Sequence, residues 1–257
     1  MIAPTPDPER LGGIAWLERT RGALTSREKR SLLGIVARTQ GQNVVGRLKL
    51  ATGRVPETVA GIDHTLLAPP DSTLAREAEV ACHDQPAALI GHGYRTWAYG
   101  RALAALDRVE LDEELFYVAG LLHDAGLVES VAGEDFTLRS GERAARCVEA
   151  SGTSMHSIDL VRDAISAHAT PGASIDEDGP LAVYVQAGAL LDLAGFRLWD
   201  LPPSYVQQVL AAHERGSITP AIVELIRAES RSVPDGRFAL LARSGFTLAV
   251  RVAPRPR

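Results

Sequence analysis

Residues 115–126 read LFYVAGLLHDAG, a run that is apolar on nearly every side of a helix until His123 and Asp124 near its end. A helix that is apolar all round is buried on all sides. Three acidic residues at 112–114 precede the run, and the helix dipole favours negative charge in a first turn. The stretch therefore predicts a buried central helix that ends near Gly126.

The rest of the chain also has helical periodicity, so we expect an all-α fold. Between residues 86 and 106, apolar residues and His92 recur at steps of three and four. The first 80 residues look mostly helical, with breaks at Gly41 and at residues 53–56 and 68–71. For residues 238–252 two alternatives stay open: a short helix followed by a strand, or a hairpin around Ser244-Gly245. Further helices are predicted at about 139–151, 157–168, 180–197, 203–214 and 218–229.

The composition is that of an ordinary globular protein: 257 residues, 46% hydrophobic and 23% charged. The net charge of −5 gives no support for nucleic-acid binding, which usually involves a basic surface. The longest apolar stretches, such as 181–193, are too short to span a bilayer, and we see no secretory signal. We expect a cytoplasmic protein with a small-molecule substrate and no nucleic-acid or membrane partner. A homo-oligomer is left open, and Cys82 and Cys147 are expected to be reduced.

Four polar residues fall on faces that the helical pattern reserves for the core. His92 lies on the face of Leu89 and Thr96, and His123 lies on the apolar face of the central run. His168 continues an apolar stripe that begins at residue 158, and Asp192 sits within one over residues 182–196. Polar side chains in such positions need a partner inside the protein.

The two aspartates, Asp124 and Asp192, are the informative members. Burying an unpaired carboxylate is costly, and no lysine or arginine lies on the inward face near either one, although a partner from elsewhere in the fold stays open. One shared divalent cation would satisfy both acids together with His92 and His123. The mixed nitrogen and oxygen set suits Zn or Fe, and also Mn or Ni, better than Ca or Mg.

Small residues flank these positions. Gly188 and Gly195 lie one turn on either side of Asp192, and Gly120 and Gly126 bracket the His-Asp pair. Close packing of helices alone would explain them. Beside an inward-facing acid, however, small residues also let helices approach closely enough for short side chains to reach a common ion.

The ordered set His92, His123-Asp124, Asp192 resembles the H…HD…D signature of the HD superfamily of metal-dependent hydrolases. Within that superfamily the chain is most similar to the cyanamide hydratase group, over roughly residues 60–205. The stretches that carry the likeness are the Pro70-Asp71-Ser72 turn, HGYRTWAYG at 92–100, LLHDAGL at 121–127, AISAHAT at 164–170 and QAGALLDLAG at 186–195.

The resemblance implies an all-α HD-domain helical bundle around a single metal site. His92, His123, Asp124 and Asp192 would be the ligands, and His168 matches a histidine that lines the pocket in such proteins. Dinuclear relatives carry further histidines after the HD pair, whereas residues 133–145 contain none.

The resemblance also implies a division of the chain. The HD domain would span residues 61–215. An N-terminal helical extension, residues 1–60, and a small C-terminal extension, residues 216–257 with a helix and a tail, would pack on this core.

Departures from related groups favour the addition of water to a small, cyanamide- or nitrile-like molecule. Nucleotide phosphohydrolases of the superfamily often place an acid three residues after the HD aspartate, where this chain has Leu127. Enzymes acting on cyclic dinucleotides carry further His and GYP elements that are absent here. In a hydratase, His168 is our candidate proton donor. Arg95, one turn beyond His92, is our candidate for orienting or polarising the substrate.

Two other functions stay open. The first is a metal-dependent phosphohydrolase of nucleotides or other phosphate monoesters, which would be favoured if Arg95, Arg139 and Arg197 lined the metal site. The second is a non-catalytic, metal-stabilised HD sensor or binding module.

Overall fold

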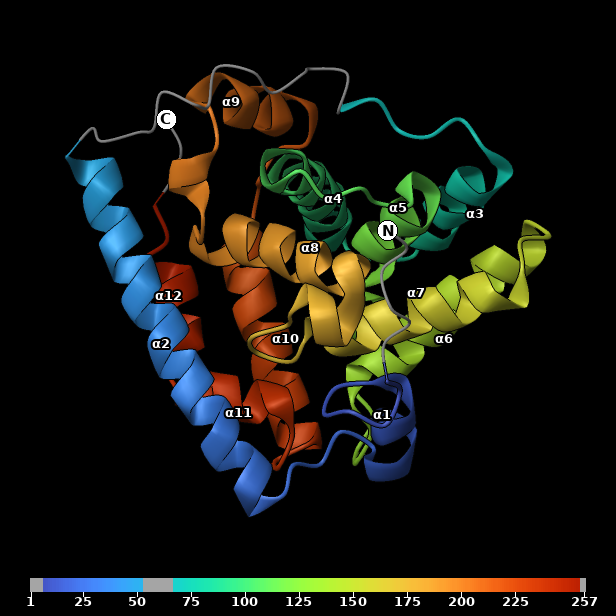
Figure 1. The fold of residues 1–257 in the computed structure, drawn as a ribbon, viewed down its shortest axis with the longest axis horizontal. Helices are drawn as coiled ribbons and strands as arrows, with labels where there is room; N and C mark the ends of the chain where they lie inside the picture. The colour runs from blue at the N-terminus through green and yellow to red at the C-terminus, as the bar shows by residue number, and fades with distance from the viewer. Residues whose placement is uncertain (1–6, 53–66, 255–257) are drawn as a thin grey trace.

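Helices form the fold in residues 7–52 and 67–254, the part of the chain that a computed structural model describes (Figure 1). Within these residues no β-strand forms, and one isolated antiparallel bridge joins Val131 and Glu134. The predicted all-α class is confirmed. None of the described helices is long and apolar enough to cross a bilayer. The elements are α1 Ile14–Thr20, α2 Ser26–Ala51, α3 Thr73–Cys82, α4 Ala87–Asp107, α5 Glu113–Leu122, η3 Ala125–Leu127, α6 Phe136–Ala150, α7 Met155–His168, α8 Ile175–Ala194, η4 Leu198–Asp200, α9 Pro203–Ala212, α10 Ile218–Ser232, α11 Arg237–Arg243 and α12 Phe246–Arg251.

The centre of the molecule is α4, which packs against α8 and α5 (Figure 1). Small residues allow these close approaches. A Cβ added at Gly188 of α8 would collide with the Thr96 carbonyl oxygen of α4. One added at Gly120 of α5 would lie 2.8 Å from the Trp97 Cβ. The glycines therefore bring the three helices that carry His92, His123 and Asp192 into direct contact.

Three features differ from the sequence prediction. First, α2 runs without a break through Gly41, because a single glycine costs a helix only about 1 kcal/mol. Second, neither alternative for residues 238–252 is correct: α11 and α12 form there, joined at Ser244-Gly245, with Gly245 at φ 87°. Apolar side chains at helical spacing, Phe238 with Leu241, explain this result. Third, α5 is shorter than predicted and ends at Leu122. The predicted break at 53–56 lies outside the described residues.

The N-terminal segment is held against the helices that lie behind the candidate site. Arg10 binds Asp163 of α7 at 2.8 Å and Asp178 of α8 at 2.7 Å. Trp16 and Leu17 of α1 are buried in a small cluster that also contains residues of α6 and α11. These contacts attach α1 to the helical core.

A buried polar network joins α11 to the loop before α6. Arg237 is fully buried and donates to both carboxylate oxygens of Asp135, at 2.8 and 3.2 Å. Glu229 of α10 lies nearby and accepts the Phe136 N–H at 3.0 Å. Burial and the neighbouring Asp135 charge raise the pKa of Glu229 to about 7.

The Glu229 carboxyl should make the stability of the protein depend on pH. Its pKa is raised in the folded state above the ordinary 4.5. The stability it contributes is therefore fully present below about pH 4.5 and is lost as the pH rises through about 7. Glu229→Gln keeps an acceptor for the Phe136 N–H and removes this titration. Between about pH 5 and about pH 8.5, the free energy of unfolding of the variant should rise by about 2–3 kcal/mol relative to wild type.

Urea unfolding at the two pH values measures this difference. Glu224→Gln, an exposed position on the same helix, is the matched control and should show no such change. An equal effect of Glu229→Gln at both pH values would mean that this carboxyl does not titrate between them.

Candidate metal centre

The turn that follows α5 places His123 and Asp124 side by side. His123 is the C-cap of α5, and the chain then tightens through Asp124 into η3. Gly126 fixes this turn: its N–H donates to the Ser140 hydroxyl at 2.9 Å, and a Cβ at this position would collide with the backbone of α6. The early end of α5 therefore turns both side chains toward α4, where His92 lies.

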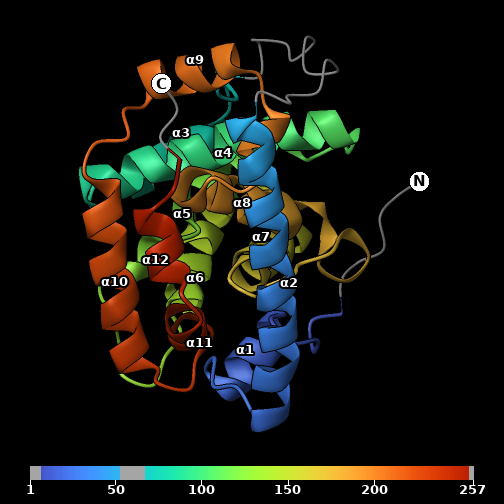
Figure 2. The ribbon, with the colours of Figure 1, turned by 90° about the vertical axis from the view of Figure 1, so that its left-hand side faces the viewer.

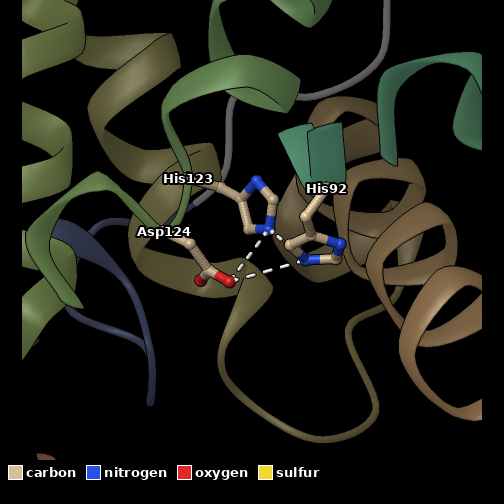
Figure 3. Close-up of side chains that lie close together, drawn as sticks. All are labelled: His92, His123 and Asp124. Atoms are coloured by element: carbon tan, nitrogen blue, oxygen red, sulfur yellow. Dashed lines mark hydrogen bonds and ion pairs between the residues drawn. The ribbon is translucent and has the colours of Figure 1, made fainter. Parts of the chain in front are cut away.

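Three ligand atoms converge there, as Figure 3 shows. The Nε2 atoms of His92 and His123 are 3.3 Å apart. The Oδ2 atom of Asp124 is 3.5 Å from the Nε2 of His92 and 3.4 Å from that of His123. Two donors bound to a tetrahedral ion at its usual bond lengths lie about 3.3–3.6 Å apart. The spacings therefore fit one divalent ion, and this buried group could hold it.

The hydrogen bonds of the two imidazoles leave their Nε2 atoms available as ligands. The Nδ1 of His123 donates to the Gly120 carbonyl at 2.8 Å, and the Nδ1 of His92 donates to Asp192 Oδ2 at 2.7 Å. Histidines that bind metals usually donate their other ring N–H to a carbonyl or a carboxylate in this way. With the proton on Nδ1, each Nε2 has a lone pair available for an ion held beside Asp124.

Asp124 is almost completely buried, and histidine side chains are the groups that face it. Burial disfavours its charge, but the imidazoles of His123, His168 and His92 hold the pKa of the carboxyl well below its usual range. Burial likewise disfavours the charged form of His92, yet Asp124 and Asp192 raise its pKa. The field that favours a proton on His92 also favours a divalent cation between its Nε2 and Asp124. In the described chain, His92, His123 and Asp124 are the one group of three or more His, Cys, Asp or Glu side chains with this spacing.

His168, at the end of α7, stands beside this group. Its Nε2 is 3.6 Å from Asp124 Oδ1, and its Nδ1 donates to the Ile165 carbonyl at 2.5 Å. Burial lowers the pKa of His168, and the nearby Asp124 offsets this only in part. Its surroundings therefore favour the neutral form of the imidazole.

Asp192 has a partner that the helical pattern did not reveal. Arg95 of α4 is fully buried and donates to both carboxylate oxygens of Asp192, at 2.8 and 2.9 Å. It also donates to the Glu214 carbonyl at 2.7 Å. The charge of Asp192 is thus balanced by a cation from another helix, which was the alternative left open by the sequence.

This pairing places both residues behind the ligand group. Asp192 contacts His92 through Nδ1, on the opposite side of the ring from Asp124. Direct ligation by Asp192 therefore stays a prediction, and what the structure shows is that Asp192 orients His92. Arg95 contacts Asp192 and backbone carbonyls and is absent from the lining of the neighbouring cavity. The position of Arg95, three residues after His92 on the same side of a buried helix, was the feature of the sequence that could have indicated its buried ion pair.

A cavity of about 130 Å³ opens from the site. Its polar end is formed by His123, Asp124 and His168. Its other walls come from α2, α8, α10, α11 and α12. Figure 2 shows α11 and α12 between α10 and α2. Among the described residues that line it there is no lysine or arginine.

The other two arginines considered from the sequence are engaged elsewhere. Arg139 pairs with Glu134 at 2.8 Å, and Arg197 pairs with Asp107 at 2.7 Å and Asp200 at 2.8 Å. Neither lines the cavity. The described part of the cavity therefore lacks the cationic lining that a phosphate ester would favour.

Comparison with known proteins assigns no family. No protein-family model and no curated protein matches the chain. The likeness to the HD superfamily therefore stays a prediction from the residues quoted above. The geometry of His92, His123 and Asp124 is what identifies the candidate centre.

Proposed function

We propose that the protein is a metal-dependent hydrolase or hydratase of the HD superfamily, similar to the cyanamide hydratase group, that adds water to a small neutral molecule with a nitrile-like group. The supporting observation is the triangle of His92 Nε2, His123 Nε2 and Asp124 Oδ2, with sides of 3.3–3.5 Å, at the polar end of a cavity.

The ligand group would hold one divalent ion, with Zn or Fe preferred on donor type. Such an ion would lower the pKa of a water beside it, so that the water gives up its proton more readily near neutral pH. His92, His123 and Asp124 provide the contacts, and Asp192 fixes the ring of His92 through Nδ1. Loss of a hydrogen-bond partner of this kind typically lowers metal affinity by about 10–100-fold.

His168 is the proposed proton carrier. Its neutral Nε2 can accept the proton that water loses as the oxygen bonds to the nitrile carbon. The same atom can then return that proton to the nitrogen, giving an imidic acid that rearranges to the amide. The depressed pKa of His168 suits this order, because the imidazole accepts before it donates.

Charge supports a neutral substrate over a phosphate ester. A phosphate monoester would bring its charge beside the Asp124 carboxylate, and apart from the proposed ion the described lining of the cavity offers no arginine or lysine to balance it. A nitrile or a cyanamide is uncharged and makes no such demand.

Two assays test the proposal. Purified protein should contain close to one equivalent of a divalent metal, and it should convert cyanamide to urea and simple nitriles to amides. Phosphate release from a nucleotide monophosphate panel is the comparison. Undiminished activity after complete metal removal would contradict the mechanism. Phosphate release alone would favour the phosphohydrolase, and bound metal without any turnover would favour the sensor.

His168→Ala is expected to lower kcat by about 10²–10⁴-fold, the usual contribution of a general acid or base, while the metal content stays that of wild type. The reason is that His168 faces Asp124 at 3.6 Å but lies outside the ligand triangle. Steady-state kinetics and metal analysis on the same preparation measure both quantities. His156→Ala, at an exposed histidine, is the matched control. Loss of the metal from His168→Ala would make His168 a ligand instead.

A further inference from the structure

Away from its polar end, the cavity is apolar. Aliphatic and aromatic side chains from four helices enclose it, and most of them belong to the second hydrophobic cluster of the core. They are Leu190 and Leu193 of α8, Ile222 and Ile226 of α10, Phe238 and Leu241 of α11, and Phe246 of α12.

The polar side chains among these walls are mostly engaged within the protein. The Gln186 amide donates to the carbonyls of His168 and Thr170, both at 2.6 Å, and its oxygen accepts the Ala173 N–H at 3.3 Å. The Thr39 hydroxyl of α2 donates to its own helix. Gln40 of α2 also lines the cavity. Away from α2, the side chains of α10, α11 and α12 that line the cavity are apolar, so a polar or charged group placed against them would lose its hydration without compensation.

The size of the cavity narrows the ligand further. Its volume is about 130 Å³. An engineered cavity of about 150 Å³ in another protein, lined by Leu, Ile and Phe, binds benzene. The same residue types line this cavity at a similar volume. Cyanamide is much smaller and more polar than benzene, so it would make few apolar contacts with these walls.

We infer that the cavity binds an uncharged apolar group about the size of a benzene ring, placed against Phe238 and Phe246, with the reacting nitrile directed at His168. The inference rests on the proposed function for the reacting end of the substrate. The seat for the ring stands on the cavity alone, so binding and turnover can be tested separately.

Toluene is a suitable probe of the seat, because it has the ring and no reactive group. Ligand-observed NMR or calorimetry on the metal-loaded protein should show saturable binding of one equivalent, which benzonitrile displaces. Benzoate and benzylamine, charged molecules of similar size, should bind at least about tenfold more weakly. In turnover, kcat/KM for benzonitrile should exceed that for acetonitrile by at least about tenfold.

Two variants fill the cavity from opposite walls. Ala189→Leu adds volume from α8, and Thr39→Phe adds it from α2. Each should weaken toluene binding by at least about tenfold. Ala37→Phe, at an exposed position on α2, is the matched control and should leave binding unchanged. Circular dichroism checks folding, and should Ala189→Leu fail to fold, Thr39→Phe carries the test.

The outcomes separate the two claims. Saturable toluene binding that both filling variants weaken supports the inference even if no nitrile is hydrated, a result that would contradict the proposed function. Turnover of cyanamide without toluene binding overturns the inference and leaves the proposed function standing. Toluene binding that neither filling variant changes also overturns it, because the ring would then lie elsewhere.

Discussion

Asp124→Asn is expected to yield a folded protein that no longer holds its metal. Asparagine has nearly the same shape as aspartate but carries no negative charge. It therefore cannot offset the charge of an ion held together with His92 and His123. The loss of affinity should exceed the roughly 10–100-fold that removal of an outer hydrogen-bond partner causes, and turnover should fall with it. Metal analysis after dialysis, with circular dichroism for the fold, measures both.

A comparison with Asp192→Asn shows whether Asp192 is a direct metal ligand or acts through His92. If Asp192 acts through His92, its variant should lose about 10–100-fold in affinity and still load at high metal concentration. If it is a direct ligand, as the motif predicts, its variant should lose metal as completely as Asp124→Asn. Asp159→Asn, an exposed position on α7, should behave as wild type. Full metal retention in Asp124→Asn would exclude the site described here.

Of the single variants, Arg95→Met is expected to lose the most stability, about 3–5 kcal/mol in the free energy of unfolding. The reason is that the fully buried guanidinium binds both oxygens of Asp192. Removing the guanidinium leaves a buried carboxylate without its cation. This destabilises a protein far more than replacing both charged partners does. Urea unfolding of wild type and variant measures the difference.

The double variant Arg95→Met, Asp192→Asn completes the cycle. Because it removes both charges, it should be more stable than Arg95→Met alone, and the coupling between the two positions should be favourable. Arg76→Met, in an exposed pair with Asp71, should cost at most about 1 kcal/mol. A change in KM for Arg95→Met with stability unaltered would instead support the substrate contact predicted from the sequence.

The sequence predicted the fold class and three converging side chains because both follow from local rules. Helical periodicity gave the all-α class. Polar residues on apolar faces, with the adjacent His-Asp pair, gave the predicted ligands His92, His123, Asp124 and Asp192, of which the first three form the group. The structure brings these three together. His92 lies within the long helix α4, and His123 and Asp124 directly follow a short helix that is apolar on nearly every side, so their segments are easily recognised in the sequence.

The remainder depends on how distant helices are rotated and placed. The pairing of Arg95 with Asp192 requires the relative rotation of α4 and α8, which no periodicity specifies. The cavity is built partly from α2 and α10 to α12, which lie outside the stretch that resembles a known family. The two short helices at the C-terminal end bury their apolar side chains, at helical spacing, in a second hydrophobic cluster, and neither of the two alternatives left open by the sequence includes this arrangement.

The contacts of Arg95 have one more consequence. A continuous relay of hydrogen bonds runs from the ligand His92 through Asp192 and Arg95 to the Glu214 carbonyl, just before α10 begins. The same helix presents Ile222 to the cavity. A coupling between the ion site and the cavity would run through these contacts and the start of α10. By thermodynamic reciprocity, whatever factor a cavity ligand applies to metal affinity, the metal applies to the affinity for that ligand.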